Sequence, residues 1–84
     1  MAIVNEWCVV CKDGISKSVF KKTIKLLEKT YPSISCVEKS YREVYPCFVI
    51  KTAIEDVISL INYTQSLENV VFIESNKGGH QRAL

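Results

Sequence analysis

The sequence is poor in the residues that most enzyme sites require. It contains one histidine, His80, which lies in the tail, away from any obvious serine or cysteine partner. Only three glycines are present, and the pair at 78–79 follows a predicted strand without opening a helix, so no glycine-rich phosphate loop is found. The acidic residues are scattered. We therefore expect a protein that is not an enzyme and that uses no cofactor.

Long apolar runs and a strong charge bias are missing too. No stretch approaches the roughly 20 apolar residues of a membrane helix, and residues 1–6 lack the basic start and apolar run of a signal peptide. Lys and Arg outnumber Asp and Glu by 11 to 9, so the net charge of +2 does not argue for nucleic acid. We expect a cytoplasmic protein without a membrane partner, in a compartment where thiols stay reduced.

The patterns that are present alternate between strand and helix. Alternating or continuous apolar runs predict strands over 6–12, 33–39, 44–51 and 69–74. Apolar residues at helical spacing predict one helix over 16–29, with Ser16 as its N-cap. A capping box at Thr52 and Glu55 predicts that a second helix begins there and runs to about Ser66.

The order strand, helix, strand, strand, helix, strand predicts an α+β fold. With right-handed crossovers, it favours a ferredoxin-like βαββαβ sandwich. This fold has a four-stranded antiparallel sheet with two helices on one face, and the first and third strands lie in its middle. Residues 1–75 are predicted to form this single domain, and residues 76–84 to form a flexible C-terminal tail.

The sheet face that the helices leave open is the candidate binding surface. In the third predicted strand the charged Lys51 shares its face with Cys47 and Val49, which indicates that this face is open. The first strand is apolar on both faces, and we expect Trp7 and Val9 to lie on the open face, with Cys8, Val10, Phe48 and Ile50 facing the helices. The predicted site comprises Trp7, Val9, Cys47, Val49 and Lys51, with Trp7 as the anchor because tryptophan is enriched at interface hot spots.

The four cysteines allow other chemistries. Segment 7–12, WCVVCK, resembles the thioredoxin active-site motif, but only six residues precede Trp7 and a strand would direct Cys8 and Cys11 to opposite faces. A zinc site is disfavoured because only one cysteine pair has ligand spacing. The alternative is that these thiols fill the core as small apolar groups. The zinc candidates are Cys8, Cys11, Cys36, Cys47 and His80.

RNA binding through the same open face is a further alternative. Segment 45–51, YPCFVIK, is loosely similar to the third-strand motif of RNA-recognition domains, and Trp7 or Tyr45 could stack on bases. That motif places aromatic residues at alternate positions. Here Pro46 and Lys51 occupy two of the three, and Phe48 is the one match.

Two short segments, VVCKDG at 9–14 and LENVVFIESN at 67–76, lie at the two ends of the patterned region. The first resembles the opening strand and turn of the subtilisin-propeptide family, which includes free-standing serine-protease inhibitors, and the second resembles the closing strand of that family. Segment 48–51 sits where the family has its third strand, although Pro46 replaces the usual glycine. The resemblance implies that the open face docks on a protease and that the tail enters the substrate cleft. The tail residues are Gln81, Arg82, Ala83 and Leu84.

These patterns together predict a small non-enzymatic module, regulatory or inhibitory, that docks another protein through its open sheet face. A homodimer formed through the same face competes with this reading. RNA binding and thiol redox chemistry through Cys8 and Cys11 remain as alternatives.

Overall fold

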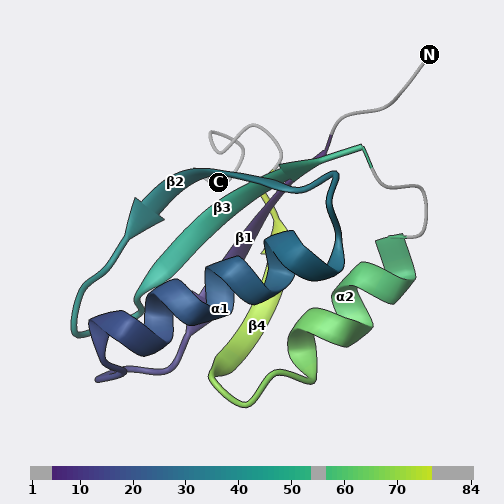
Figure 1. Cartoon of the computed structure of the whole chain (residues 1–84). Coiled ribbons are helices and arrows are strands. Elements are labelled where there is room, and N and C mark those ends of the chain that lie inside the picture. Colours follow the sequence, from purple (N-terminus) through teal and green to yellow (C-terminus); the bar gives the residue numbers. More distant parts are fainter. Residues whose placement is uncertain (1–4, 54–56, 77–84) are drawn as a thin grey trace, which may run out of the picture.

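The computed structural model describes residues 5–53 and 57–76 of the chain. Its elements follow the order β1 (Asn5–Cys11), α1 (Lys17–Thr30), β2 (Ser35–Ser40), β3 (Cys47–Thr52), α2 (Val57–Gln65) and β4 (Val70–Ser75) (Figure 1). The strands form one sheet in the order β2-β3-β1-β4, and every neighbouring pair is antiparallel. The chain therefore has the ferredoxin-like α+β fold that its pattern predicts.

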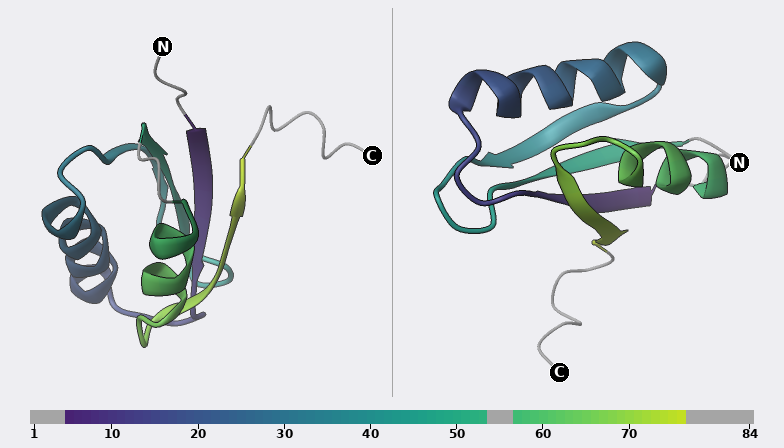
Figure 2. Two further views of the ribbon diagram at one scale, coloured as in Figure 1. Left: turned by 90° about the vertical axis from the view of Figure 1, so that its right-hand side faces the viewer. Right: turned by 90° about the horizontal axis from the view of Figure 1, so that it is seen from below.

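Both helices lie on the same side of the sheet. Seen nearly edge-on, the sheet has α1 and α2 on one side and no described helix on the other (Figure 2). Helix α2 packs near β4, and α1 lies toward β2 (Figure 1). The fold is thus a two-layer sandwich, and one sheet face is left without a helical cover.

The core lies between the helices and the sheet. Phe48 of β3 is buried and meets Phe20 of α1 edge-on, with ring centroids 5.9 Å apart. Leu27 of α1 and Leu60 of α2 are fully buried in the same cluster. Helix α1 contributes this stripe because its apolar residues recur at three- and four-residue spacing. Burying each of these large side chains contributes about 1.5–3 kcal/mol.

The limits of α1 follow from local chemistry. The Ser16 hydroxyl accepts a hydrogen bond from the Val19 amide at 3.2 Å, which satisfies one of the donors left over at a helix start. The helix ends at Thr30, before Tyr31, because the next residue, Pro32, has no backbone N–H group to continue the helical hydrogen bonds. The predicted N-cap at Ser16 is therefore confirmed.

The predicted orientation of the first strand is wrong. Val9 is fully buried in the core opposite Phe48 and Ile73, and Trp7 packs against the same core. Cys8 and Val10 occupy the open face instead, because successive side chains of a strand point to opposite faces. Both faces of β1 are apolar, so hydrophobicity alone could not decide which of its two faces points toward the helices.

Two strands begin two or more residues later than predicted. Strand β2 begins at Ser35 rather than at 33, because a turn follows α1 in which the Ile34 amide donates to the Tyr31 carbonyl oxygen. Strand β3 begins at Cys47 because residues 41–46 form a loop.

The predicted start of the second helix falls outside the described residues. Thr52, one half of the expected capping box, is the buried last residue of β3, and its hydroxyl shares a hydrogen bond with the hydroxyl of Ser33. Glu55, the other half of the expected capping box, falls outside the described residues. The described part of α2 begins at Val57.

Candidate functional site

An apolar stripe crosses the middle of the open face. The register places Cys8 opposite Val49, and Val10 between Cys47 and Phe72. These five side chains come from the two central strands and from β4, and they all point away from the helices. We call them the apolar stripe. Their spacing follows from strand alternation and from the 4.7–4.9 Å between paired strands.

The accessible part of this stripe lies at its margins. Val10 and Val49 are each only 7% exposed, whereas Cys8, Cys47 and Phe72 are half-buried. The guanidinium of Arg42 approaches the Cys47 sulfur at 4.0 Å, so a cation reaches one end of the stripe. A partner on this face would contact the two sulfurs and the Phe72 ring first, with the valines beneath.

Charged side chains of both signs border the stripe. Glu38 of β2 stands opposite Val49, and Glu74 of β4 stands opposite Cys8. Glu6 and Lys51 face each other across β1 and β3. All four are exposed, and they give the border three carboxylates and one ammonium group. Arg42 beside Cys47 and the exposed Lys12 after β1 add two cations. A complementary surface would be apolar at its centre, with basic groups opposite the three carboxylates.

The predicted site is partly recovered by this arrangement. Cys47, Val49 and Lys51 lie on the open face as predicted, because Lys51 marked that face correctly. Trp7 and Val9 lie on the helical side. The tail residues 81–84 fall outside the described part of the chain.

Sequence reasoning missed Cys8, Val10 and Phe72. The sequence held a signal for Cys8 and Val10. Counting by twos along the strand, they lie between Glu6 and Lys12, and both of these charged residues are exposed. The two charges mark this face of β1 as the solvent side, as Lys51 does in β3.

The indole of Trp7 lies against the core on the helical side. It faces Ile50 of β3 and Ser75 of β4 in the sheet register. Its Nε1 atom is buried and has no hydrogen-bond partner within the described structure. Trp7 is therefore a packing residue, and it cannot anchor a partner on the open face.

Cys8 and Cys11 do not form a reactive pair. They lie on opposite faces of β1, since Cys11 is fully buried on the helical side. Burial, with a smaller contribution from the nearby Cys47, raises the pKa of the Cys11 thiol from 9.0 to about 11. A nucleophilic cysteine needs the opposite shift. The geometry gives no support to thiol redox chemistry at this motif.

The raised pKa of Cys11 makes stability sensitive to alkaline pH. The unfolded thiol ionises near pH 9 and the folded thiol only near 11, so this contribution is complete below pH 9 and is lost as the pH rises toward 11. At about 1.4 kcal/mol per pKa unit, the loss amounts to about 2–3 kcal/mol. Urea unfolding at several pH values should show this extra decline, and Cys11→Val should remove it. Identical pH profiles for the two proteins would contradict the assignment.

The loop between β2 and β3 is tied to the turn after β1. The Asp13 carboxylate accepts a hydrogen bond from the Tyr45 amide at 2.6 Å, and the Gly14 amide donates to the Glu43 carbonyl oxygen at 3.0 Å. The Tyr41 hydroxyl donates to the Ile15 carbonyl oxygen at 2.8 Å. Tyr45 has a φ of 52°, in the left-handed region that costs a non-glycine residue about 1–2 kcal/mol. Its side chain is 61% exposed.

We expect Asp13→Ala to lower the free energy of unfolding by about 1–2 kcal/mol, because it removes the acceptor that holds the strained Tyr45 backbone. Asp13→Asn keeps an acceptor oxygen at the same position and serves as the matched control. It should cost less than about 0.5 kcal/mol. Chemical denaturation measures both. Equal losses in the two variants would mean that charge, rather than this hydrogen bond, matters.

The two sheet edges are poorly suited to pairing with another chain. The register shifts between Cys36 and Glu38 in β2, which leaves Val37 as an extra residue. It shifts again where β1 meets β4, which leaves Val71 as an extra residue. Such bulges twist an edge strand away from a straight pairing geometry. Neither edge is therefore favoured for the addition of a strand from another chain.

The described residues give no support for a metal site or for a membrane-spanning helix. Residues 5–53 and 57–76 contain no cluster of three His, Cys, Asp or Glu side chains that could hold a metal ion. Neither described helix has the length and apolar character to cross a membrane.

Comparison with known proteins connects the chain to a fold. No family model and no curated protein sequence matches it. Its structure is similar to that of phospho-2-dehydro-3-deoxyheptonate aldolase (DAHP synthase) from Thermotoga maritima, with a TM-score of 0.67 and 20% identity. The match covers 87% of this chain and 20% of the enzyme, so the chain spans about one fifth of that protein's length. At this identity the likeness shows a shared α+β fold.

Proposed function

We propose that this chain is a non-enzymatic regulatory or inhibitory module that docks another protein through its open sheet face. The observation that carries the proposal is the apolar stripe, which lies on the helix-free side within a charged border that includes three exposed carboxylates. Apolar centres inside a charged rim are typical of protein interfaces. The bulged edges favour this face over strand addition.

The three carboxylates of the border bear on the kind of partner. Glu6, Glu38 and Glu74 favour a protein that brings basic side chains around an apolar centre. The same carboxylates would repel RNA phosphates, and Phe72 is the one aromatic side chain that the described strands offer there for base stacking.

A charge-reversal experiment tests the docking face. A tagged copy isolates the partner, which is then identified and purified so that its Kd can be measured directly. Glu38→Lys combined with Glu74→Lys should weaken binding by about tenfold or more, because both changes oppose a basic rim. The matched control combines Glu43→Lys with Glu68→Lys, which changes the net charge equally at exposed sites outside the four strands. Equal weakening by both pairs, or no weakening by either, would refute the proposal.

Sedimentation tests the homodimer alternative, and protease assays test the inhibitor version of the proposal. A stable dimer at micromolar concentration would replace the protein-partner proposal with self-association. For a propeptide-like inhibitor, the full chain should inhibit subtilisin, and truncation after Asn76 should abolish inhibition because the resemblance assigns the tail to the cleft. An absence of inhibition by the full chain would discard the inhibitor version and leave the docking proposal in place.

A further inference from the structure

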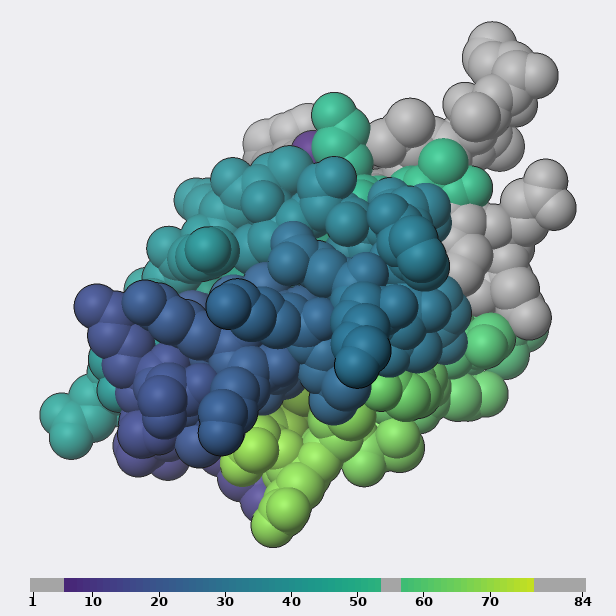
Figure 3. All heavy atoms as spheres, viewed as in Figure 1, coloured from purple at the N-terminus to yellow at the C-terminus, as the bar shows by residue number. Residues whose placement is uncertain are grey.

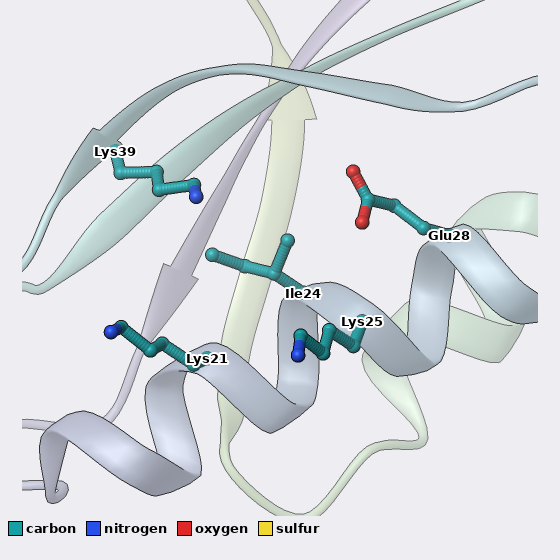
Figure 4. Close-up of a pocket in the computed structure, with 5 residues that line it drawn as sticks. All are labelled: Lys21, Ile24, Lys25, Glu28 and Lys39. Atoms are coloured by element: carbon teal, nitrogen blue, oxygen red, sulfur yellow. The ribbon is translucent and has the colours of Figure 1, made fainter.

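A small hollow lies on the helical side of the molecule, between α1 and β2. On this face the atoms of α1 lie beside those of β2 (Figure 3). The hollow has a volume of about 240 Å³ and is lined by Lys21, Ile24, Lys25, Glu28 and Lys39. Lys39 extends from β2 toward α1, with Ile24 between the two elements (Figure 4). Ligand sites for drug-sized molecules measure roughly 300–1,000 Å³, so this hollow suits a smaller molecule.

The lining is strongly cationic. Three ammonium groups from two different elements stand against one carboxylate. That carboxylate, on Glu28, turns toward β2 and accepts a hydrogen bond from the Cys36 amide at 3.3 Å (Figure 4). Burial raises the pKa of the neighbouring Cys36 thiol, so this group stays neutral at physiological pH and adds no negative charge.

We infer that this hollow binds the phosphate group of a small phosphate monoester, with Lys21, Lys25 and Lys39 as its cationic contacts. Lysine ammonium groups bind phosphate oxygens as point charges, and three of them can share the charge of a dianion. Glu28 repels the phosphate from its own end of the hollow and leaves an acceptor there for a hydroxyl group of the ligand. The Ile24 side chain forms an apolar floor between the two ends.

This site is independent of the open face. Lys39 stands opposite Phe48, which points into the core, so it lies on the helical side of the sheet. The apolar stripe lies on the other side of the same sheet. Loss of phosphate binding in the hollow would therefore leave protein binding at the open face unchanged, and the reverse also holds. Each of the two proposals can thus fail without the other.

Titration of the ¹⁵N-labelled protein with inorganic phosphate tests the inference, with chloride at matched ionic strength as the reference. Saturable shifts confined to the amides of residues 21–28 and 36–39 are expected. Lys21→Gln and Lys39→Gln should each weaken phosphate binding by about fivefold. Lys22→Gln removes an equal charge from the same helix outside the hollow and should change affinity by less than about twofold. Shifts spread over all the lysines, or equal weakening in the three variants, would overturn the site.

Two further measurements define the ligand. Glu28→Gln keeps an acceptor for the Cys36 amide and should tighten binding of inorganic phosphate by about twofold or more, because a repelling charge is gone. Glycerol 3-phosphate should bind the wild-type protein more tightly than inorganic phosphate does. Vesicles of phosphatidylcholine containing phosphatidic acid supply the same group on a membrane. Binding to these vesicles without competition by soluble glycerol 3-phosphate would overturn the small-molecule site.

Discussion

Replacing Trp7 with alanine should lower the free energy of unfolding by about 3 kcal/mol, as expected for truncation of a large packed aromatic side chain. Trp7→Phe should cost less than about 1 kcal/mol. The smaller ring loses some contacts, but the change also removes the buried Nε1–H group that has no partner in the described structure. The sequence contains one tryptophan, so circular dichroism rather than fluorescence must follow unfolding of these variants.

This pair of substitutions decides between packing and binding roles for the indole. If Trp7 were an interface anchor, its truncation would lower stability only slightly and would greatly lower the affinity for the partner. A packed indole gives the reverse, and its fluorescence in the wild-type protein should be blue-shifted until the chain unfolds. Unchanged stability in Trp7→Ala would return Trp7 to the candidate surface residues.

Phe48→Ala should be the most destabilising of the substitutions considered, at about 3–5 kcal/mol. The ring is almost completely buried and makes an edge-on contact with Phe20, which adds to the energy of area burial. Natural proteins have about 0.05–0.15 kcal/mol of stability per residue, so this loss is a large part of the total for a chain of 84 residues. We expect a broadened or incomplete unfolding transition at 25 °C.

The matched control for Phe48→Ala lies on α2. Ile58 is 71% exposed, and Ile58→Ala should change stability by less than about 0.5 kcal/mol. Thermal unfolding of both variants checks the difference. A Phe48→Ala protein as stable as the Ile58→Ala protein would mean that the ring is not part of the core.

The fold was accessible from sequence because its signals are local. The helical stripe of α1, the Ser16 cap and the alternation in β3 each depend on residues within a few positions of one another. The orientation of β1 could not be set in this way, because both of its faces are apolar and the inward face is decided by pairing with β3 and β4. The charges of Glu6 and Lys12 were the available local clue.

The parts of the site that sequence could not predict depend on distant contacts. Tyr45 keeps its left-handed backbone because the carboxylate of Asp13, 32 positions earlier, accepts a hydrogen bond from its amide. The cationic hollow likewise exists only because α1 and β2 bring Lys21 and Lys39 together. Along the sequence, the lysines of α1 fit an ordinary solvated helix face equally well.

The strand order has a consequence for how the protein is made. Strand β1 is synthesised first but lies in the middle of the sheet, where one of its two neighbours is β4. Until β4 leaves the ribosome, one whole side of β1 lacks its hydrogen-bonding neighbour, and the growing chain is open to wrong pairings. Completion of the sheet must therefore wait for β4, and pairing over this sequence distance favours slow folding.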